Sequence, residues 1–433
     1  MNKIKVLNIC VAGLGNVGAA LVSYITSKKE EIKKKSQLEI NIVGVSAKNK
    51  SKKRNCDISS FPWFDNALDL LSVNNCDVLI ELIGQEKDLS YELVKTALEK
   101  KLHVVTGNKA MLALYGGELF KIAEKNDVLL LYEAAVAGGI PIIKLIKNNL
   151  FLNKIKKISG ILNGTTNYIL SKMQEDNLSF DEVLKIAKSK GYTSDKESDL
   201  DIGGLDAAHK LTILSTLAFG SEIDFSLNET TGINNITIED IKFANQLGYR
   251  IKLISETSLI DGKINAVTCP RLIPKFNPIA NVNGPLNAVN IETDQLQNLF
   301  LEGEGAGGKA TASSIISDLY EIASNTSISS LGFSSLNLKK YLKFEHHNIE
   351  SNYYVRIMTK DLPGVLSKIT SYFNESKISI EKILQIPDNK EIIPIIISTH
   401  RIKSKKLMNA ITKIQSLSFV MQKISIIQIN QDI

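Results

Sequence analysis

Asp206 and Lys210 are the two residues whose types and spacing most directly suggest chemistry. They lie four positions apart in a segment with apolar residues at helical intervals, namely Leu211, Ile213, Leu214 and Leu217. On a helix, residues four apart share a face. A lysine beside a reacting oxygen can supply positive charge and a proton, particularly if burial lowers its pKa. The spacing alone also fits an ordinary exposed ion pair. We therefore treat the two residues as a candidate acid–base pair that needs further support.

A glycine-rich turn near the start of the chain is typical of a nucleotide site. Its six residues are Gly13, Leu14, Gly15, Asn16, Val17 and Gly18. They lie between a predicted strand over residues 6–12 and a predicted helix over residues 17–27. In this context the glycines permit a tight turn, close backbone approach to a pyrophosphate and close helix packing. A simple tight turn is the alternative, but the strand–turn–helix setting favours dinucleotide binding.

The segment after the second predicted strand bears on which dinucleotide binds. An acidic residue there would hold the ribose 2′-hydroxyl of NAD. After the strand over residues 40–45 the chain has instead a run of lysines, and no carboxylate appears before Asp57. A solvated basic loop is the plain alternative. The position favours NADP, with NAD still possible, and Lys48 and Lys50 are the expected contacts of the 2′-phosphate.

Alternating strands and helices predict that this part of the chain is a doubly wound parallel sheet. Further strands are expected over residues 78–82, 104–106 and 128–131, and helices over 67–71, 91–100 and 117–126. Lys109 follows the strand over 104–106, at the carboxyl edge where sites of such sheets lie. We expect a nucleotide-binding domain over residues 1–139, and an α+β substrate and dimerisation domain over 140–333, whose end returns to the nucleotide domain.

The C-terminal part has a different pattern. Residues 334–351, with the adjacent His346 and His347, are expected to be a solvated linker and not a metal site. Over 352–433, strands at 353–359, 378–385, 392–399 and 420–429 and helices at 365–374 and 405–417 predict a ferredoxin-like βαββαβ domain.

Composition excludes several classes of protein. The 52 basic and 46 acidic side chains leave a mild, dispersed charge of +6, which does not indicate a nucleic-acid partner. No stretch reaches the roughly 18 apolar residues that a membrane span needs. The four cysteines are far apart, as in a reducing compartment, and are Cys10, Cys56, Cys76 and Cys269. We therefore expect a cytoplasmic protein with a small-molecule substrate.

Several longer segments resemble homoserine dehydrogenases in order and spacing. They are ELIG at 81–84, HVVTGNKA at 103–110, EAAVAGGIP at 133–141, GILNGTTNY at 160–168, GLDAAHK at 204–210 and GEGAGG at 303–308. The resemblance covers residues 3 to about 331. It implies NAD(P)-dependent interconversion of L-aspartate 4-semialdehyde and L-homoserine, in the biosynthesis of threonine, methionine and isoleucine.

The resemblance also implies roles for individual residues. Lys210 becomes the proton donor to the aldehyde oxygen, with Asp206 orienting it and Lys109 near both nicotinamide and substrate. Further substrate contacts fall on Asp195, Asp201, Asn163 and Thr165, and further cofactor contacts on Gly84 and Gly305. A structural monovalent cation such as sodium is implied at Glu133, Val136, Gly138 and Ile140. The chain departs from the family at Asp195, which stands where a glutamate is usual, and it lacks the proline that normally follows.

The tail resembles ACT domains, which bind amino acids where two copies pair. The resemblance rests on DLPGVL at 361–366, in which Gly364 lets backbone amides at a helix start face a carboxylate. It implies feedback by threonine and a homodimer or homotetramer. The alternative is a dimerisation module without a ligand.

Two other functions compete with this interpretation. An aspartate-semialdehyde dehydrogenase needs a cysteine nucleophile, and none of the four cysteines follows a strand beside a plausible base. A non-catalytic NADP- and amino-acid-binding regulator would explain the altered Asp195 segment, but it has no use for a proton-donating lysine.

Overall fold

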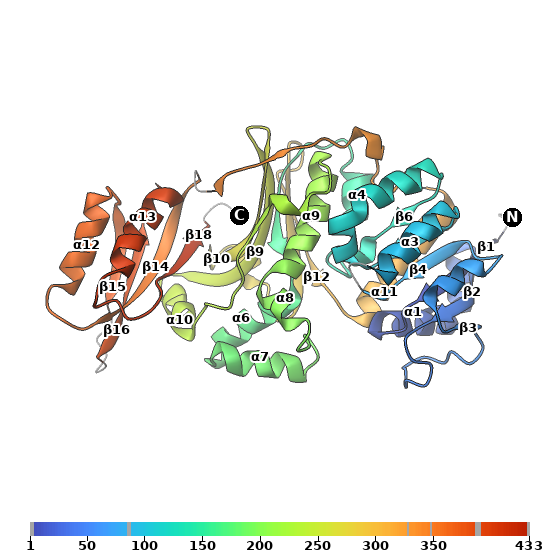
Figure 1. Cartoon of the computed structure of the whole chain (residues 1–433), viewed down its shortest axis with the longest axis horizontal. Helices are drawn as coiled ribbons and strands as arrows, with labels where there is room; N and C mark the ends of the chain where they lie inside the picture. Colours follow the sequence, from blue (N-terminus) through green and yellow to red (C-terminus); the bar gives the residue numbers. More distant parts are fainter. Residues whose placement is uncertain (1–3, 85–87, 327–328, 347–348, 386–390, 431–433) are drawn as a thin grey trace.

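The computed structural model describes residues 4–84, 88–326, 329–346, 349–385 and 391–430. Within these residues the chain forms three parts that lie in a row along the long axis of the molecule (Figure 1). The first, which we call the nucleotide part because it contains the predicted glycine turn, is a parallel sheet with the order β3-β2-β1-β4-β5-β6. Its strands are β1 (Lys5–Ala12), β2 (Leu38–Ser46), β3 (Trp63–Phe64), β4 (Val78–Glu81), β5 (His103–Thr106) and β6 (Leu130–Leu131).

This sheet confirms the predicted doubly wound architecture. The chain runs outward from β1 to β3 and then returns to β4 on the other side of β1, so the strand order reverses between β1 and β4. Ligands of such sheets bind at the carboxyl ends of the strands beside this reversal. Its helices are α1 (Asn16–Ser27), α2 (Lys29–Ser36), α3 (Leu89–Glu99) and α4 (Lys109–Lys125). Helix α4 begins eight residues earlier than the helix expected from residue 117, so Lys109 is its first residue.

A helix from much later in the chain covers the same sheet. Helix α11 (Gly308–Ser324) packs along α1, beside the nucleotide part in Figure 1. Its buried residues Ala312, Ile315 and Leu319 share one apolar core with residues of β1 and α1. Burying apolar surface from both segments holds the late helix against the early one.

The second part is built on a mixed sheet. Its central strands are β7 (Ile155–Ile161), β9 (Tyr249–Ile260), β10 (Lys263–Pro274), β11 (Leu286–Thr293) and β12 (Asn298–Glu304), which pair antiparallel in the order β12-β11-β7-β9-β10. Helix α9 (Leu205–Phe219) lies on β7, β9 and β10. Nearby helices are α6 (Gly164–Asp176), α7 (Phe180–Ser189), α8 (Ser198–Ile202) and α10 (Ile238–Gln246).

The third part confirms the predicted βαββαβ unit. It comprises β14 (Glu350–Lys360), α12 (Val365–Glu375), β15 (Ile380–Gln385), β16 (Ile392–Thr399), α13 (Ser404–Gln415) and β18 (Ser425–Ile429), with sheet order β18-β14-β16-β15. Strand β18 also pairs in parallel with β10, at Arg271 with Gln428 and Leu272 with Ile429. The C-terminal sheet therefore continues the sheet of the second part.

The segment expected to be a linker makes contacts along its length. Its strand β13 (Leu342–Lys343) pairs with β10, and Lys339 bridges to Ser221. His346 packs edge-on against Phe344, and His347 lies outside the described residues. In the described part of the chain, no three His, Cys, Asp or Glu residues gather to hold a metal ion. Among the same residues, no helix combines the length and apolar character that crossing a bilayer requires.

A buried ionic junction joins the second and third parts. The guanidinium of Arg356 on β14 donates to both carboxylate oxygens of Asp240 on α10, over 2.7 and 3.0 Å, and the Tyr354 hydroxyl donates to the same carboxylate over 3.0 Å. Asp240 also caps its own helix by accepting from Thr237. Because every charge here has a partner, burial of Asp240 is tolerated.

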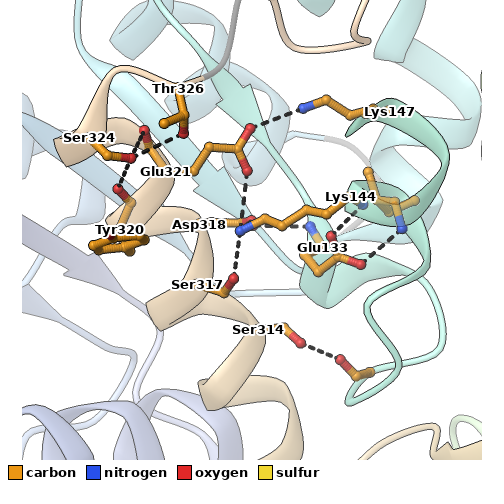
Figure 2. Close-up of polar contacts among 12 residues, drawn as sticks. Glu133, Lys144, Lys147, Ser314, Ser317, Asp318, Tyr320, Glu321, Ser324 and Thr326 are labelled. Carbon is orange, nitrogen blue, oxygen red and sulfur yellow. Dashed lines mark hydrogen bonds and ion pairs between the residues drawn. The ribbon is translucent and has the colours of Figure 1, made fainter. Parts of the chain in front are cut away.

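A second charged cluster, shown in Figure 2, ties α11 to the end of the nucleotide part. Both oxygens of the buried Glu133 carboxylate accept backbone N–H groups, from Ile143 at 2.9 Å and Lys144 at 2.8 Å. The Glu133 amide donates to Asp318 on α11 over 3.0 Å. The Lys144 ammonium lies 3.0 Å from Asp318 and 3.2 Å from Glu321, which also pairs with Lys147.

This cluster makes folding stability depend on pH. Burial raises the pKa of Glu133 from 4.5 to about 7, and the nearby charge of Asp318 adds to the shift. The folded protein therefore keeps a proton that the unfolded chain releases, so stability falls as the pH rises through this window. In the native protein, the free energy of unfolding should fall between pH 5 and pH 7. We expect Glu133→Gln to reduce that fall by about 2 kcal/mol, as measured by urea unfolding at each pH.

The matched control is Glu375→Gln, which removes an exposed carboxylate on α12 and should keep the native pH slope. The two variants are compared by slope, because the amide introduced by Glu133→Gln has one acceptor oxygen where the carboxylate has two. An unchanged slope in Glu133→Gln would contradict the assignment of the proton to this residue.

Candidate active site

The candidate acid–base pair lies at the start of α9. Gly204 precedes the helix with a φ of +83°, a left-handed conformation that glycine adopts without strain. Asp206 is in the first turn and Lys210 in the next. The Lys210 ammonium donates to Asp206 Oδ2 and to the backbone carbonyl of Leu162, each over 2.7 Å. These two contacts occupy two of the three ammonium protons and leave the third for another acceptor.

Asn163 connects this pair to a second carboxylate. Its side-chain oxygen caps α6 by accepting the Thr166 amide over 2.8 Å. Its side-chain nitrogen donates to Asp206 over 2.9 Å and to Asp201 over 2.7 Å. Asp201 also accepts from the Thr193 hydroxyl over 2.7 Å. Helices α6, α8 and α9 therefore meet through one amide group.

Lys109 reaches the same carboxylate from the nucleotide part. Its ammonium lies 3.3 Å from Asp206 Oδ1, and its side chain is 40% exposed. A chain of hydrogen bonds fixes the start of α4. The buried Glu81 carboxylate accepts the Thr106 hydroxyl over 2.7 Å, Thr106 accepts the Asn108 amide over 3.0 Å, and Asn108 caps the helix. Asp206 is thus shared by two lysines from different parts of the chain.

The surrounding charges set the protonation of this site. Burial raises the pKa of Asp206, but the charges of Lys210 and Lys109 outweigh it and hold that pKa well below its usual value. Burial, followed by the charge of Asp206, raises the pKa of Asp201. The charge of Asp206 also raises the pKa of Lys109, with smaller contributions from Asp201 and Glu197. At neutral pH the site therefore contains an ionised Asp206 beside a cationic Lys109.

The glycine turn has the shape of a diphosphate cradle. A side chain at Gly18 would come within 2.0 Å of the Gly13 carbonyl oxygen, so helix and strand approach as closely as glycine allows. At Gly15, by contrast, the added Cβ would meet no atom within 4 Å. Gly15 is also the N-cap of α1, and no side chain caps that end. The turn therefore offers open space and uncapped amides to an anion.

The late glycine segment lies beside this cradle. A Cβ at Gly308, the first residue of α11, would come within 2.9 Å of the Asn16 carbonyl oxygen. Gly305 packs against the Asn287 side chain, and Gly138 packs against the Gly305 backbone. Gly84 is placed by Glu81, which accepts its amide over 3.2 Å. The structure thus brings Gly84 and residues 305–308 to the carboxyl edge where the turn lies.

The basic loop is folded against the same turn. Arg54 donates to the carbonyl of Leu14 over 3.3 Å and to the carbonyls of Lys50 and Lys52. The Arg54 guanidinium lies 5.6 Å from the centre of the Trp63 ring, and the Lys50 ammonium lies 5.9 Å from it. Lys48 is in the same loop. Sequence patterns did not single out Arg54 or Trp63. Their contacts join segments that are separate in the sequence, and such contacts leave no local pattern.

Two predicted substrate residues do not join the cluster around Asp206. The Asp195 side chain is 91% exposed and pairs with Lys188 over 2.8 Å. The Thr165 hydroxyl donates to the Tyr192 carbonyl over 2.9 Å, which ties α6 to the chain before α8. Thr193 and Glu81 were missed, because their roles depend on contacts with other segments.

The turn expected to hold a cation has its carboxylate occupied. The Glu133 side chain points to α5 (Ile142–Lys144), as described above. The Gly138 carbonyl accepts the Ser314 hydroxyl over 2.6 Å, and the Ile140 carbonyl accepts the Ile142 amide over 2.8 Å. The fit to an ion therefore rests on the backbone carbonyls of Val136, Gly138 and Ile140 and not on the carboxylate.

Three family models match this chain. The homoserine dehydrogenase NAD-binding domain matches residues 13–133, the homoserine dehydrogenase model matches 141–320, and the ACT domain matches 353–415. A homoserine dehydrogenase of Pseudomonas aeruginosa is 36% identical over 435 residues, covering 99% of each chain.

Solved structures agree with these matches. A homoserine dehydrogenase from Thiobacillus denitrificans is 36% identical and has a TM-score of 0.91, with both chains fully covered. A hyperthermophilic archaeal homoserine dehydrogenase mutant in complex with NADPH is 26% identical, with a TM-score of 0.61, over 74% of this chain and 98% of that one. The chain therefore belongs to the homoserine dehydrogenase family, a family of oxidoreductases, and carries a C-terminal ACT domain.

Proposed function

We propose that the protein interconverts L-aspartate 4-semialdehyde and L-homoserine with NADP as its preferred cofactor, and that Lys210 moves the proton. The observation that carries this proposal is the arrangement of Lys210 and Lys109 on one largely buried carboxylate, Asp206, in a chain of this family. The reaction belongs to the biosynthesis of threonine, methionine and isoleucine.

Lys210 is suited to serve the substrate oxygen. Asp206 and the Leu162 carbonyl hold two of its protons, so the third has a fixed direction. In reduction of the aldehyde, Lys210 gives that proton to the oxygen that becomes the alcohol. In oxidation of homoserine, the neutral amine takes the proton back. When bound, the nicotinamide supplies or accepts the hydride at the substrate carbon.

The neighbouring side chains position the substrate. Lys109 contributes a cation from the nucleotide part, 3.3 Å from Asp206, and would lie near the nicotinamide and the substrate when both are bound. Asp201 presents a carboxylate that suits the ammonium end of the amino acid, and Asn163 supports the substrate site by holding Asp201 and Asp206 through its side-chain amide. Asp195 joins them only if the turn over residues 194–198 moves, and Thr165 acts by holding the chain at Tyr192.

The nucleotide is proposed to bind along the glycine turn. Residues 13–18 receive the diphosphate, Gly84 and Gly305 allow the backbone to approach, and Lys48 and Lys50 contact the 2′-phosphate. Arg54 supports this assignment by holding the basic loop against Leu14. A likeness to a relative solved with NADPH also supports it.

Three further features extend the proposal. A structural monovalent cation such as sodium is proposed at the carbonyls of Val136, Gly138 and Ile140, with Glu133 bracing α5. The ACT domain is proposed to bind threonine at the loop around Gly364, as feedback inhibitor. The enzyme is proposed to act as a homodimer or homotetramer. A non-catalytic regulator is the alternative function, and the shared contacts of Lys210 argue against it.

Replacing Lys210 tests the proposed chemistry. We expect Lys210→Ala to lower kcat for NADP-dependent oxidation of L-homoserine by about 10²–10⁴-fold, the usual contribution of a general acid or base. Binding of NADP should be retained, measured by quenching of protein fluorescence. The control is Lys185→Ala, an exposed lysine on α7, which should keep the native rate. Turnover that survives in Lys210→Ala would contradict the proton role, and no turnover in the native protein would favour the regulator.

Cofactor preference is tested at the basic loop. We expect Lys48→Ala/Lys50→Ala to raise KM for NADP by at least about 100-fold, because each of the two lost charge-assisted contacts contributes roughly 1.5–3 kcal/mol. KM for NAD should change little, since NAD has no 2′-phosphate. Lys121→Ala, an exposed lysine on α4, is the control. Equal losses with both cofactors would contradict a 2′-phosphate contact.

A further inference from the structure

A cavity opens where the C-terminal domain joins the central sheet. It measures about 200 Å³ and lies between β7, β9 and β10 on one side and the ends of β14 and β18 on the other. Among the residues that line it are Glu256, Arg271, Glu350, Asn352, Arg401 and Gln428. A single ordered water needs only about 10–15 Å³, so the cavity has room for a small organic molecule. We call it the seam cavity.

A largely buried ion pair forms one wall of the seam cavity. The Arg271 guanidinium donates through Nη1 to Glu256 Oε2 over 3.0 Å, and the Arg271 side chain is 4% exposed. Its Nε is buried and has no hydrogen bond to an oxygen or nitrogen acceptor among the described residues, and the neighbouring side chain is the weakly accepting Cys269 thiol. An unmet donor of a buried cation is costly. An acceptor on a bound molecule would satisfy it.

The remaining lining residues define the chemistry of that molecule. Arg401, on the C-terminal domain, adds a second guanidinium at the cavity. Lys157 on β7 also lines the cavity, but its ammonium group pairs with Glu292 over 3.8 Å. The Glu256 and Glu350 carboxylates lie at the same cavity and provide negative charge. A ligand that matches both signs carries a carboxylate and an ammonium group. The amide side chains of Asn352 and Gln428 suit a short polar side chain.

We propose that the seam cavity is a binding site for a small polar α-amino acid, with its carboxylate on Arg271 and Arg401 and its ammonium group on the acidic side. Because the lining comes from two parts of the chain, the bound amino acid contacts the central sheet and the C-terminal domain at once. Binding therefore strengthens the docking of that domain.

The seam cavity is separate from the loop around Gly364. Glu350 and Asn352 stand at the beginning of β14, whereas the loop follows its end at Lys360. At about 3.3 Å per residue, eleven residues of strand place the two sites roughly 30 Å apart. The inference is thus independent of the proposed threonine site, and of catalysis, and it is tested by direct binding.

The test is calorimetric titration of the full-length protein with L-threonine and L-serine, compared with L-lactate, which keeps the carboxylate and lacks the ammonium group. We expect both amino acids to bind and L-lactate to bind at least about tenfold more weakly. Arg401→Ala should weaken amino-acid binding by about tenfold, the effect of losing roughly 1.4 kcal/mol. Lys382→Ala, an exposed lysine on the distant strand β15, is the matched control and should bind normally.

Two further variants separate the possible results. Arg271→Met/Glu256→Gln removes both buried charges together, which avoids leaving one unpaired, and should abolish the seam binding while the protein stays folded. Gly364→Val puts a β-branched side chain at a position with a φ of +88°, which strains the distant loop at the start of α12, and it should leave seam binding intact. Native affinity in both Arg401→Ala and Arg271→Met/Glu256→Gln would overturn the proposal. So would binding that is lost only in Gly364→Val, although that result would support the threonine site at the loop.

Discussion

The structure depends on one largely buried carboxylate, Asp206, which is shared by two lysines from different parts of the chain. A carboxylate removed from water needs compensating charge and hydrogen bonds. Lys210 supplies one positive charge from one helical turn away, and Lys109 supplies another from the nucleotide part. Asn163 adds a hydrogen bond from its side-chain amide. Each partner is itself fixed by a helix terminus, at the starts of α4, α6 and α9. The site is therefore assembled only when all three helices are in place.

Two buried charge clusters keep those helices in register with the rest of the molecule. The cluster around Glu133 and Asp318 ties α11 to the turn that ends the nucleotide part. Helix α11 in turn packs on α1 beside the glycine turn, so the cofactor end and the substrate end of the site share one support. The Asp240–Arg356 junction ties the C-terminal domain to α10 of the second part.

The C-terminal domain is in physical contact with the site through continuous packing. Asp240 lies on α10, α10 packs against α6, and Asn163 caps α6 at the Asp206 carboxylate. Residues of α6, α10, β9 and the C-terminal strands also share one apolar core. Together with the pairing of β10 and β18, this makes the C-terminal domain an extension of the second part of the molecule. The docking of the domain and the positions of α10 and α6 therefore depend on the same contacts.

The sequence predicted local features well and contacts between distant segments poorly. The glycine turn, the Asp206–Lys210 spacing and the βαββαβ tail each have a pattern that lies within a few tens of residues. The sharing of Asp206 with Lys109, the bridging amide of Asn163 and the brace formed by Arg54 each join residues from separate segments. Their geometry follows from how the sheets pack, which periodicity does not encode. Position counting placed Asp195 at the substrate, but the chain folds its side chain outward to Lys188.

The most direct test of the shared carboxylate is a double-mutant cycle on kcat/KM, with Lys109→Met, Asp206→Asn and the combined variant. If Asp206 holds Lys109 in the site, the two losses overlap, and the coupling energy exceeds about 1 kcal/mol. Additive losses, within about 0.5 kcal/mol, would mean that the two residues act separately and would contradict this account of the site.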